Sequence, residues 1–199
     1  VPLDPGARSR YAARQLVNRG LLADAAAEWR RQGGDPLTLR QRLAAAEALA
    51  EIGDPDALRH ARAFPPGHDG AAAAVAARFH LRTNNRREAL AASAYALQRM
   101  SETPWAETFL MARFLTLVPD VVGEDAESLR LVSERLRRPF AGGALYEERM
   151  ALWFDLSLRP GATLDCRVPL AYYERGAPDT DAYGRARDLC LGKSATPRG

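Results

Sequence analysis

Apolar residues recur along most of this chain at intervals of three and four positions, the period of an α-helix with one buried face. Residues 21–32 illustrate the pattern, with Leu22, Ala25 and Trp29 at its apolar positions. Runs of β-branched residues, which are typical of strands, are missing, and the nearest such run is interrupted by Pro119. The pattern therefore predicts an all-α protein.

Breaks rich in Gly, Pro and Asn divide the pattern into helices. Asp35-Pro36 and Asp54-Pro55 each have the composition of an N-cap residue followed by a proline in the first helical turn. Pro119 is expected to end the helix before it, because proline lacks a backbone donor and clashes with the preceding turn. The expected helices span residues 8–19, 21–32, 37–52, 55–63, 71–83, 86–100, 105–117, 124–138, 144–158 and 180–191.

Small residues repeat at a fixed spacing within the first hundred residues. One alanine falls in the first helix of each predicted hairpin and another falls early in the second, so that the two helices can cross closely. A turn residue precedes each second helix, at Gly20, Gly53 and Asn84. The two alanine sets, each with a period of 32 residues, are Ala13, Ala45 and Ala77, and Ala25, Ala57 and Ala89.

This arrangement resembles the tetratricopeptide repeat. The best unit spans residues 73–100, where Ala77, Ala89 and Ala96 occupy the small positions and residues 84–90 look like the turn between the helices. The family period is about 34 residues, and the large aromatic residue near the start of each repeat is absent here. The resemblance implies a right-handed α-solenoid of antiparallel helical hairpins that holds another protein.

The repeat divides the chain into three parts. After residue 104 the period is lost although helices continue, and after residue 158 prolines and glycines argue against long helices. The tryptophans Trp29, Trp105 and Trp153 are interpreted as core residues, and the apolar face of the helix over 105–117 is expected to hold Trp105, Phe109, Ala112 and Leu115 or Thr116. The expected parts are three hairpins over residues 1–104, a further hairpin and a capping helix over 105–158, and a Pro/Gly-containing segment over 159–199 with a disordered end.

A basic set of side chains is the main candidate for function. In such repeats the first helix of each hairpin lines the concave face, where residues four apart are neighbours. Arginine binds carboxylates through two parallel hydrogen bonds, so a cationic groove would suit an acidic segment, a C-terminal carboxylate or a helix of a partner protein. A solvated arginine-rich face is the alternative. The predicted partner-binding residues are Arg10, Arg14, Asn18, Arg42, Arg78 and Arg82, with Ala46, Leu49 and Ala74 on the same face.

Sequence motifs for catalysis are missing. No phosphate loop, dinucleotide fingerprint, zinc-protease helix or nucleophile elbow occurs. His60, His68 and His80 fall on different predicted elements, whereas a metal site needs three or four convergent ligands. Glu124-Asp125 and Glu147-Glu148 stand at helix starts, where the helix dipole favours negative charge. The sequence therefore predicts no enzyme, no cofactor and no metal.

Charge and cysteine content narrow the possible partners. A net charge of +3 is too small to favour nucleic acid. No apolar run reaches the roughly 18 residues of a membrane span, so direct membrane insertion is not expected. Cys166 and Cys190 either form one disulfide in an oxidising compartment or remain two thiols in a reducing one. The compartment is therefore left open, with the cytoplasm slightly favoured over the periplasm.

The predicted function is a non-catalytic scaffold or adaptor that binds a segment of another protein in a basic concave groove. Because the chain begins at Val1 without Met, we expect it to belong to a longer protein, and one hypothesis is a membrane-anchored envelope or polysaccharide-secretion assembly. The alternatives are an oligomerisation or regulatory domain of a larger enzyme or complex, with a possible homo-oligomer, and a catalytic domain using scattered Glu, Asp and Arg.

Overall fold

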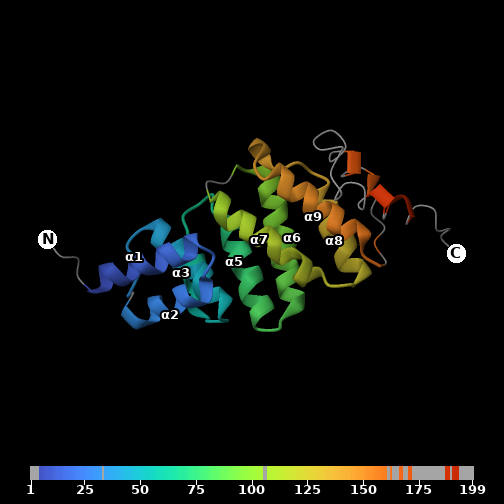
Figure 1. The fold of residues 1–199 in the computed structure, drawn as a ribbon. Helices are drawn as coiled ribbons and strands as arrows, with labels where there is room; N and C mark the ends of the chain where they lie inside the picture. The colour runs from blue at the N-terminus through green and yellow to red at the C-terminus, as the bar shows by residue number, and fades with distance from the viewer. Residues whose placement is uncertain are drawn as a thin grey trace.

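Helices account for the secondary structure of the chain wherever the computed structural model describes it (Figure 1), which is over residues 5–32, 34–104, 107–160, 162, 166–167, 170–171, 187–188 and 190–192. No strand occurs in those ranges, so the prediction of an all-α fold is confirmed. The long elements are α1 (Pro5–Asn18), α2 (Leu22–Gln32), α3 (Leu39–Glu51), α4 (Asp56–Arg62), α5 (Asp69–Arg82), α6 (Arg86–Glu102), α7 (Thr108–Val122), α8 (Ala126–Leu136) and α9 (Tyr146–Leu158), with a 3-10 turn at Ala141–Gly143 before α9.

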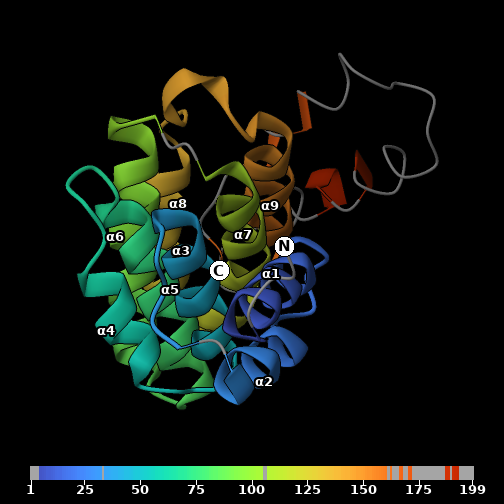
Figure 2. The ribbon, with the colours of Figure 1, turned by 90° about the vertical axis from the view of Figure 1, so that its left-hand side faces the viewer.

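The helices pack in chain order, and two further series of contacts run along the molecule. Each of α1, α3, α5 and α7 contacts the next odd-numbered helix, and α6 contacts α8. Figure 1 shows the resulting progression from α1 and α2 at one side to α8 and α9 at the other, and Figure 2 views the same ribbon from the side of α1 and α2. The contacts of α5 with α7 and of α6 with α8 cross residue 104, and the division into three parts stays a prediction.

The repeated small residues lie in the interior. All six are at most 1% exposed, so the spacing selects buried positions. A larger side chain there would push the helices apart, because protein interiors are close-packed. The turn residues also behave alike: the backbone φ is positive at Gly20 (77°), Gly53 (67°) and Asn84 (59°). That left-handed conformation ends one helix and starts the turn into the next.

Two predicted helix boundaries are wrong. The N-cap of α3 is Thr38, whose side chain accepts a hydrogen bond from the backbone N–H of Gln41, and not Asp35. Helix α7 continues through Pro119 to Val122 and ends at Gly123, whose φ is 61°. Pro119 therefore lies inside the helix, although it has no backbone N–H to donate to the preceding turn. Its own carbonyl and that of Gly123 both accept hydrogen bonds from the side chain of Arg159.

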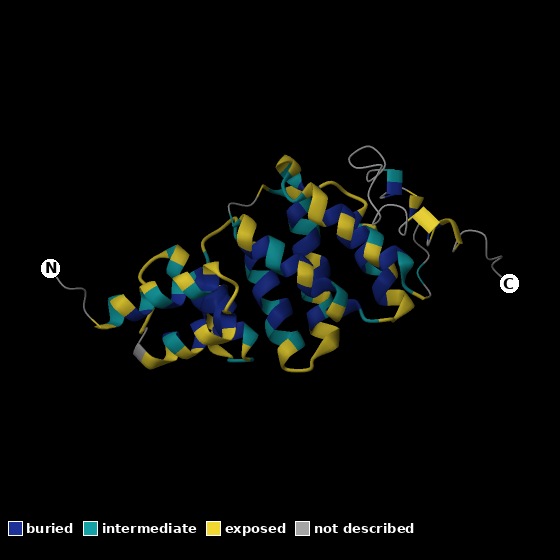
Figure 3. Cartoon of the chain, viewed as in Figure 1, coloured by how far each residue is buried: buried dark blue, intermediate teal, exposed yellow. Residues whose placement is uncertain are grey.

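The core is continuous from α1 to α9, as the buried positions between the helices in Figure 3 show. Trp29 and Trp153 are buried in it, as predicted, whereas Trp105 lies outside the described residues. Phe109 was expected on the apolar face of α7 but is 77% exposed, because Leu110, Met111 and Phe114 form the buried face instead. Among the described residues, no helix combines the length and apolar character needed to cross a membrane.

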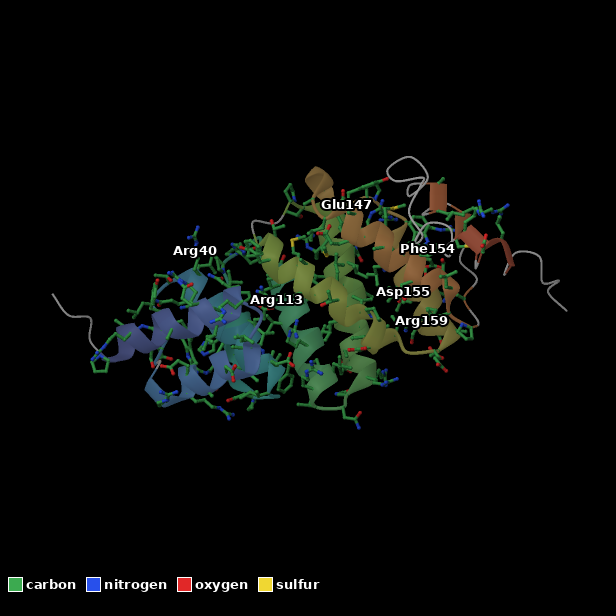
Figure 4. The ribbon with its side chains drawn as sticks, in the orientation of Figure 1. Arg40, Arg113, Glu147, Phe154, Asp155 and Arg159 are labelled. Atoms are coloured by element: carbon green, nitrogen blue, oxygen red, sulfur yellow. A yellow bond between two sulfur atoms is a disulfide. The ribbon has the colours of Figure 1, made fainter. Side chains whose placement is uncertain are left out.

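A disulfide ties two distant parts of the C-terminal region together. Cys166 and Cys190 are joined, with their Cα atoms 5.8 Å apart, so the disulfide alternative of the sequence analysis is the one found. Both cysteines are buried with Leu170, and Phe154 of α9 packs against this cluster; Figure 4 labels Phe154 on its helix. Of the helix expected over residues 180–191, residues 187–188 and 190–191 are helical, and the others lie outside the described part.

Candidate functional site

The six predicted partner-binding residues lie on three helices, and of the six only Arg78 and Arg82 line the two hollows described below. Arg10 and Arg14 are half-buried on α1, and the guanidinium of Arg14 lies over the ring of Tyr11, 5.6 Å from its centre. Asn18 is exposed at the end of the same helix. Arg42 on α3 donates a hydrogen bond of 2.7 Å to the carbonyl oxygen of Ala63.

Arg78 and Arg82 are brought together, one turn apart on α5, by a shared carboxylate. The Nη1 atom of Arg78 lies 2.6 Å from one oxygen of Glu51, and the Nη2 atom of Arg82 lies 2.6 Å from the other. The side chain of Arg78 is buried, whereas that of Arg82 is 39% exposed. Arg82 can therefore reach a ligand, and the contribution of Arg78 is to hold Glu51 in place.

A second ion pair connects α3 with α7. Arg113 donates from Nε and Nη2 to the two oxygens of Glu47, at 2.7 and 2.6 Å, in the parallel geometry that carboxylates prefer. Glu47 is 3% exposed, and Arg78 Nη2 stands 3.9 Å from it. Figure 4 labels Arg113 on α7 near the middle of the molecule. Because α5 contacts both α3 and α7, this pair bridges the two neighbours of α5.

A hollow of about 500 Å³ opens beside these side chains. Its walls are the turn from α1 into α2, the ends of α3 and α5, and the middle of α7. Three guanidinium groups converge on it, and Glu51 is only partly covered. The lining residues that matter for charge are Asp24, Glu51, Arg78, Arg82 and Arg113. The hollow is therefore lined by three arginines and two carboxylates, and Glu47 is the further carboxylate that pairs with Arg113.

A second hollow of about 650 Å³ lies beside the first and shares Arg82 with it. It is lined by Arg86 at the start of α6, by Asp120 near the end of α7, and by Glu124 in the turn that follows. Arg159 closes one side, held by its hydrogen bonds to the end of α7 and by Asp155 at 3.3 Å. Figure 4 labels Asp155 and Arg159 side by side on this flank.

Sequence reasoning missed Glu47, Glu51 and Arg113. It placed Ala46 and Leu49 on the open face, but both are buried in the core, and Glu47 beside them faces the arginines instead. A usable signal was present. Glu47 is the single charged residue within the apolar run 43–50, and a charge inside such a run must find a partner.

Of the histidines and helix-start carboxylates, His68 and Asp125 have local partners, and His60 is buried. Burial lowers the pKa of His60 below its ordinary value of 6.5, and the Nδ1 atom of His68 lies 2.9 Å from Glu107. Asp125 caps α8, and the side chain and backbone N–H of Ser128 lower the pKa of its carboxyl. No group of three or more His, Cys, Asp or Glu that could hold a metal ion occurs among the described residues.

No family model, no curated protein and no solved structure matches this chain. The geometry of the two hollows is therefore the basis for a functional assignment.

Proposed function

We propose that this chain is a non-catalytic scaffold that holds a segment of another protein against the arginine-lined hollows between α5 and α7. The supporting observation is the partly exposed guanidinium of Arg82, which lines both hollows and is fixed by Glu51 on its other side. A pre-positioned guanidinium loses little freedom on binding, and it recognises carboxylates through directed hydrogen bonds.

The helical arrangement fits this role. We propose a tetratricopeptide-like solenoid of antiparallel hairpins as the architecture, and three features support it: the contacts among successive odd-numbered helices, the buried small residues and the repeated left-handed turns. Such stacks present an extended surface to which a helix or an extended peptide can bind. The disulfide is typical of proteins that fold in an oxidising compartment, which fits a place in an envelope assembly.

The test is selection of binding sequences from a random twelve-residue peptide library displayed on phage, using three forms of the chain. The native form is compared with Arg82→Glu and with Arg87→Glu, an exposed arginine on α6 that does not line either hollow. Arg82→Glu is expected to fold, because Glu51 keeps its contact with Arg78. Circular dichroism checks that all three forms are equally helical.

The expected result is a set of carboxylate-containing sequences enriched by the native form and by Arg87→Glu but not by Arg82→Glu. Enrichment that is equal for all three forms would place binding elsewhere on the molecule. If the native form enriches nothing and elutes as a stable dimer, the oligomerisation hypothesis replaces this one.

A further inference from the structure

We infer that the two hollows act as one furrow between α5 and α7, and that this furrow holds a short extended segment carrying an acidic residue close to a basic one. The inference rests on the proposed function and adds the length and charge pattern of the bound segment.

Continuity follows from the residues that line the two hollows. Arg82 belongs to both. Along α7, Arg113 and Thr116 line the first hollow, while Asp120 and Gly123 line the second. These positions are three or four residues apart and therefore share one face of the helix. From Arg113 to Gly123 the helix rises about 15 Å, which matches about five residues of extended chain.

The charges in the second hollow are unusual because they do not pair with one another. Arg86, Asp120 and Glu124 all line it. All three are exposed, and none forms an ion pair with another residue in the described part of the chain. Arg86 is nevertheless close to the turn after α7, since its Nη1 atom lies 3.0 Å from where a Cβ on Gly123 would stand. Both signs of charge thus face one space and remain open to a ligand.

This mixture of charges selects among ligands. A polyanion such as single-stranded nucleic acid or polyphosphate would be attracted by Arg82 and Arg86 but repelled by Asp120 and Glu124. A protein segment with one carboxylate and one nearby ammonium or guanidinium group can satisfy both walls. Charges that attract the correct partner and repel the wrong one are how interfaces gain specificity. The structure therefore favours a segment of mixed charge over a uniformly acidic one.

The experiment measures binding of four synthetic peptides to the complete chain by NMR, following the side-chain N–H signals of arginine. Each peptide has six residues, blocked ends and a Ser/Gly background. Two carry one Glu and one Lys separated by two residues, in either order; one carries Glu at both positions, and one carries Gln at both. We expect one of the mixed peptides to bind at least about tenfold more tightly than the other three, the difference that one charged hydrogen bond supplies.

Three variants test which residues determine the preference for the mixed-charge peptide. Arg86→Glu should weaken the mixed peptide about tenfold. The double change Asp120→Lys with Glu124→Lys should reverse the preference, so that the peptide with two Glu residues binds best. Because this is a gain of binding, it cannot arise from a damaged fold. Glu148→Lys, an exposed change in the first turn of α9 outside both hollows, should leave the preference as it is.

An unchanged preference in the double variant, or no loss with Arg86→Glu, would overturn the inference. If Arg82→Glu weakened binding while Arg86→Glu and the double variant had no effect, the first hollow would be acting by itself. The proposed function would then stand without the furrow. Absence of binding by all four peptides at millimolar concentration would also contradict the furrow. The separate phage selection then decides whether the scaffold function survives.

Discussion

The two halves of the helical array differ in the size of the side chains that they bury. In the N-terminal half, α3 buries five alanines within residues 44–50, and α5 buries Ala71, Ala74 and Ala77. In the C-terminal half, α7 buries large side chains, among them Met111 and Phe114. Alanine lets helix backbones approach closely at fixed points, whereas large side chains fill space by interlocking shapes.

Left-handed residues end helices in both halves, Gly123 of α7 among them, but arginine donors to helix-end carbonyls are more numerous in the C-terminal half. In the N-terminal half, Gly20, Gly53 and Asn84 take the left-handed conformation and close each first helix through the backbone. In the C-terminal half, arginine side chains supply additional donors. Arg159 donates to the carbonyls at the end of α7, and Arg149 donates to the Leu136 carbonyl at the end of α8. We therefore expect stability in the C-terminal half to depend on particular long side chains. The following substitutions compare how the two halves respond to changes in packing, cross-linking and pH.

The largest expected effect is at Phe114. It is 2% exposed in the centre of α7, and Phe114→Ala should lower the free energy of unfolding by about 3–5 kcal/mol, through lost burial and the cavity left behind. Phe109→Ala, on the same helix but 77% exposed, is the control and should change it by less than about 0.5 kcal/mol. Urea denaturation followed by circular dichroism measures both. Similar costs for the two variants would contradict the assignment of the buried face.

The next effect concerns the disulfide. Replacing both cysteines with serine removes a link across 24 residues, which should destabilise the C-terminal region by about 3 kcal/mol. Hydrogen exchange should show faster exchange at Leu170 and in α9 near Phe154, which packs on the linked cysteines, with α1 to α5 unchanged. If exchange rose uniformly along the chain, the two halves would unfold as one unit and the comparison between them would fail.

Enlarging a buried side chain in the N-terminal half should lower the free energy of unfolding less than truncating one in the C-terminal half. Ala77 is 0% exposed on α5, so Ala77→Leu should destabilise the fold by about 1–3 kcal/mol. The matched control is Ala27→Leu on the exposed face of α2, which should be nearly neutral. Thermal denaturation of the two variants compares them. A neutral result at Ala77 would show that the small-residue spacing does not set the helix crossings.

The contrast between the halves also explains how far the sequence could predict the fold. Where small residues recur at buried positions, the period is visible, and the helices up to α6 were predicted with ends close to those observed. In α7 the apolar face was misassigned, because Phe109 and Phe114 look equivalent in the sequence and only the neighbouring helices decide which is buried. Pro119 also misled, because proline usually ends a helix and α7 nevertheless continues to Val122.

The candidate site was predictable only in part. Arg78 and Arg82 were found because they are one turn apart on a predicted helix. Their carboxylate partner Glu51 lies 27 residues from Arg78, and Glu47 lies 66 residues from Arg113. Such pairs form between helices that are not consecutive in the chain, so helical periodicity within one helix cannot identify them. Lone charges inside apolar runs would have been the signal to follow.

The smallest expected effect is a difference between the two halves in how their stability depends on pH. His60 on α4 and Arg149 on α9 are both buried, and burial lowers the pKa of each. Arg149 stays charged in mild acid even though burial lowers its pKa, because an arginine ordinarily loses its proton only in strong base. His60 is favoured in its neutral form by the fold, so the unfolded chain binds its proton more readily. Stability from this group is therefore complete above pH 6.5 and is lost as the pH falls through that value toward the lower pKa of the folded state.

Acidification should accordingly loosen the helices around His60 before it affects α8 and α9. The measurement is hydrogen exchange at pH 7.5 and pH 5.5, corrected for the intrinsic dependence of exchange on pH, with protection lost first in α3 to α5. His60→Leu removes the titrating group and should flatten this dependence between the two pH values. The shifted carboxyls Asp56, Glu102 and Asp125 act only in stronger acid, because their pKa values lie below ordinary values of 3.8 to 4.5. Equal sensitivity in the native chain and the variant would assign the acid response to another group and remove this difference between the halves.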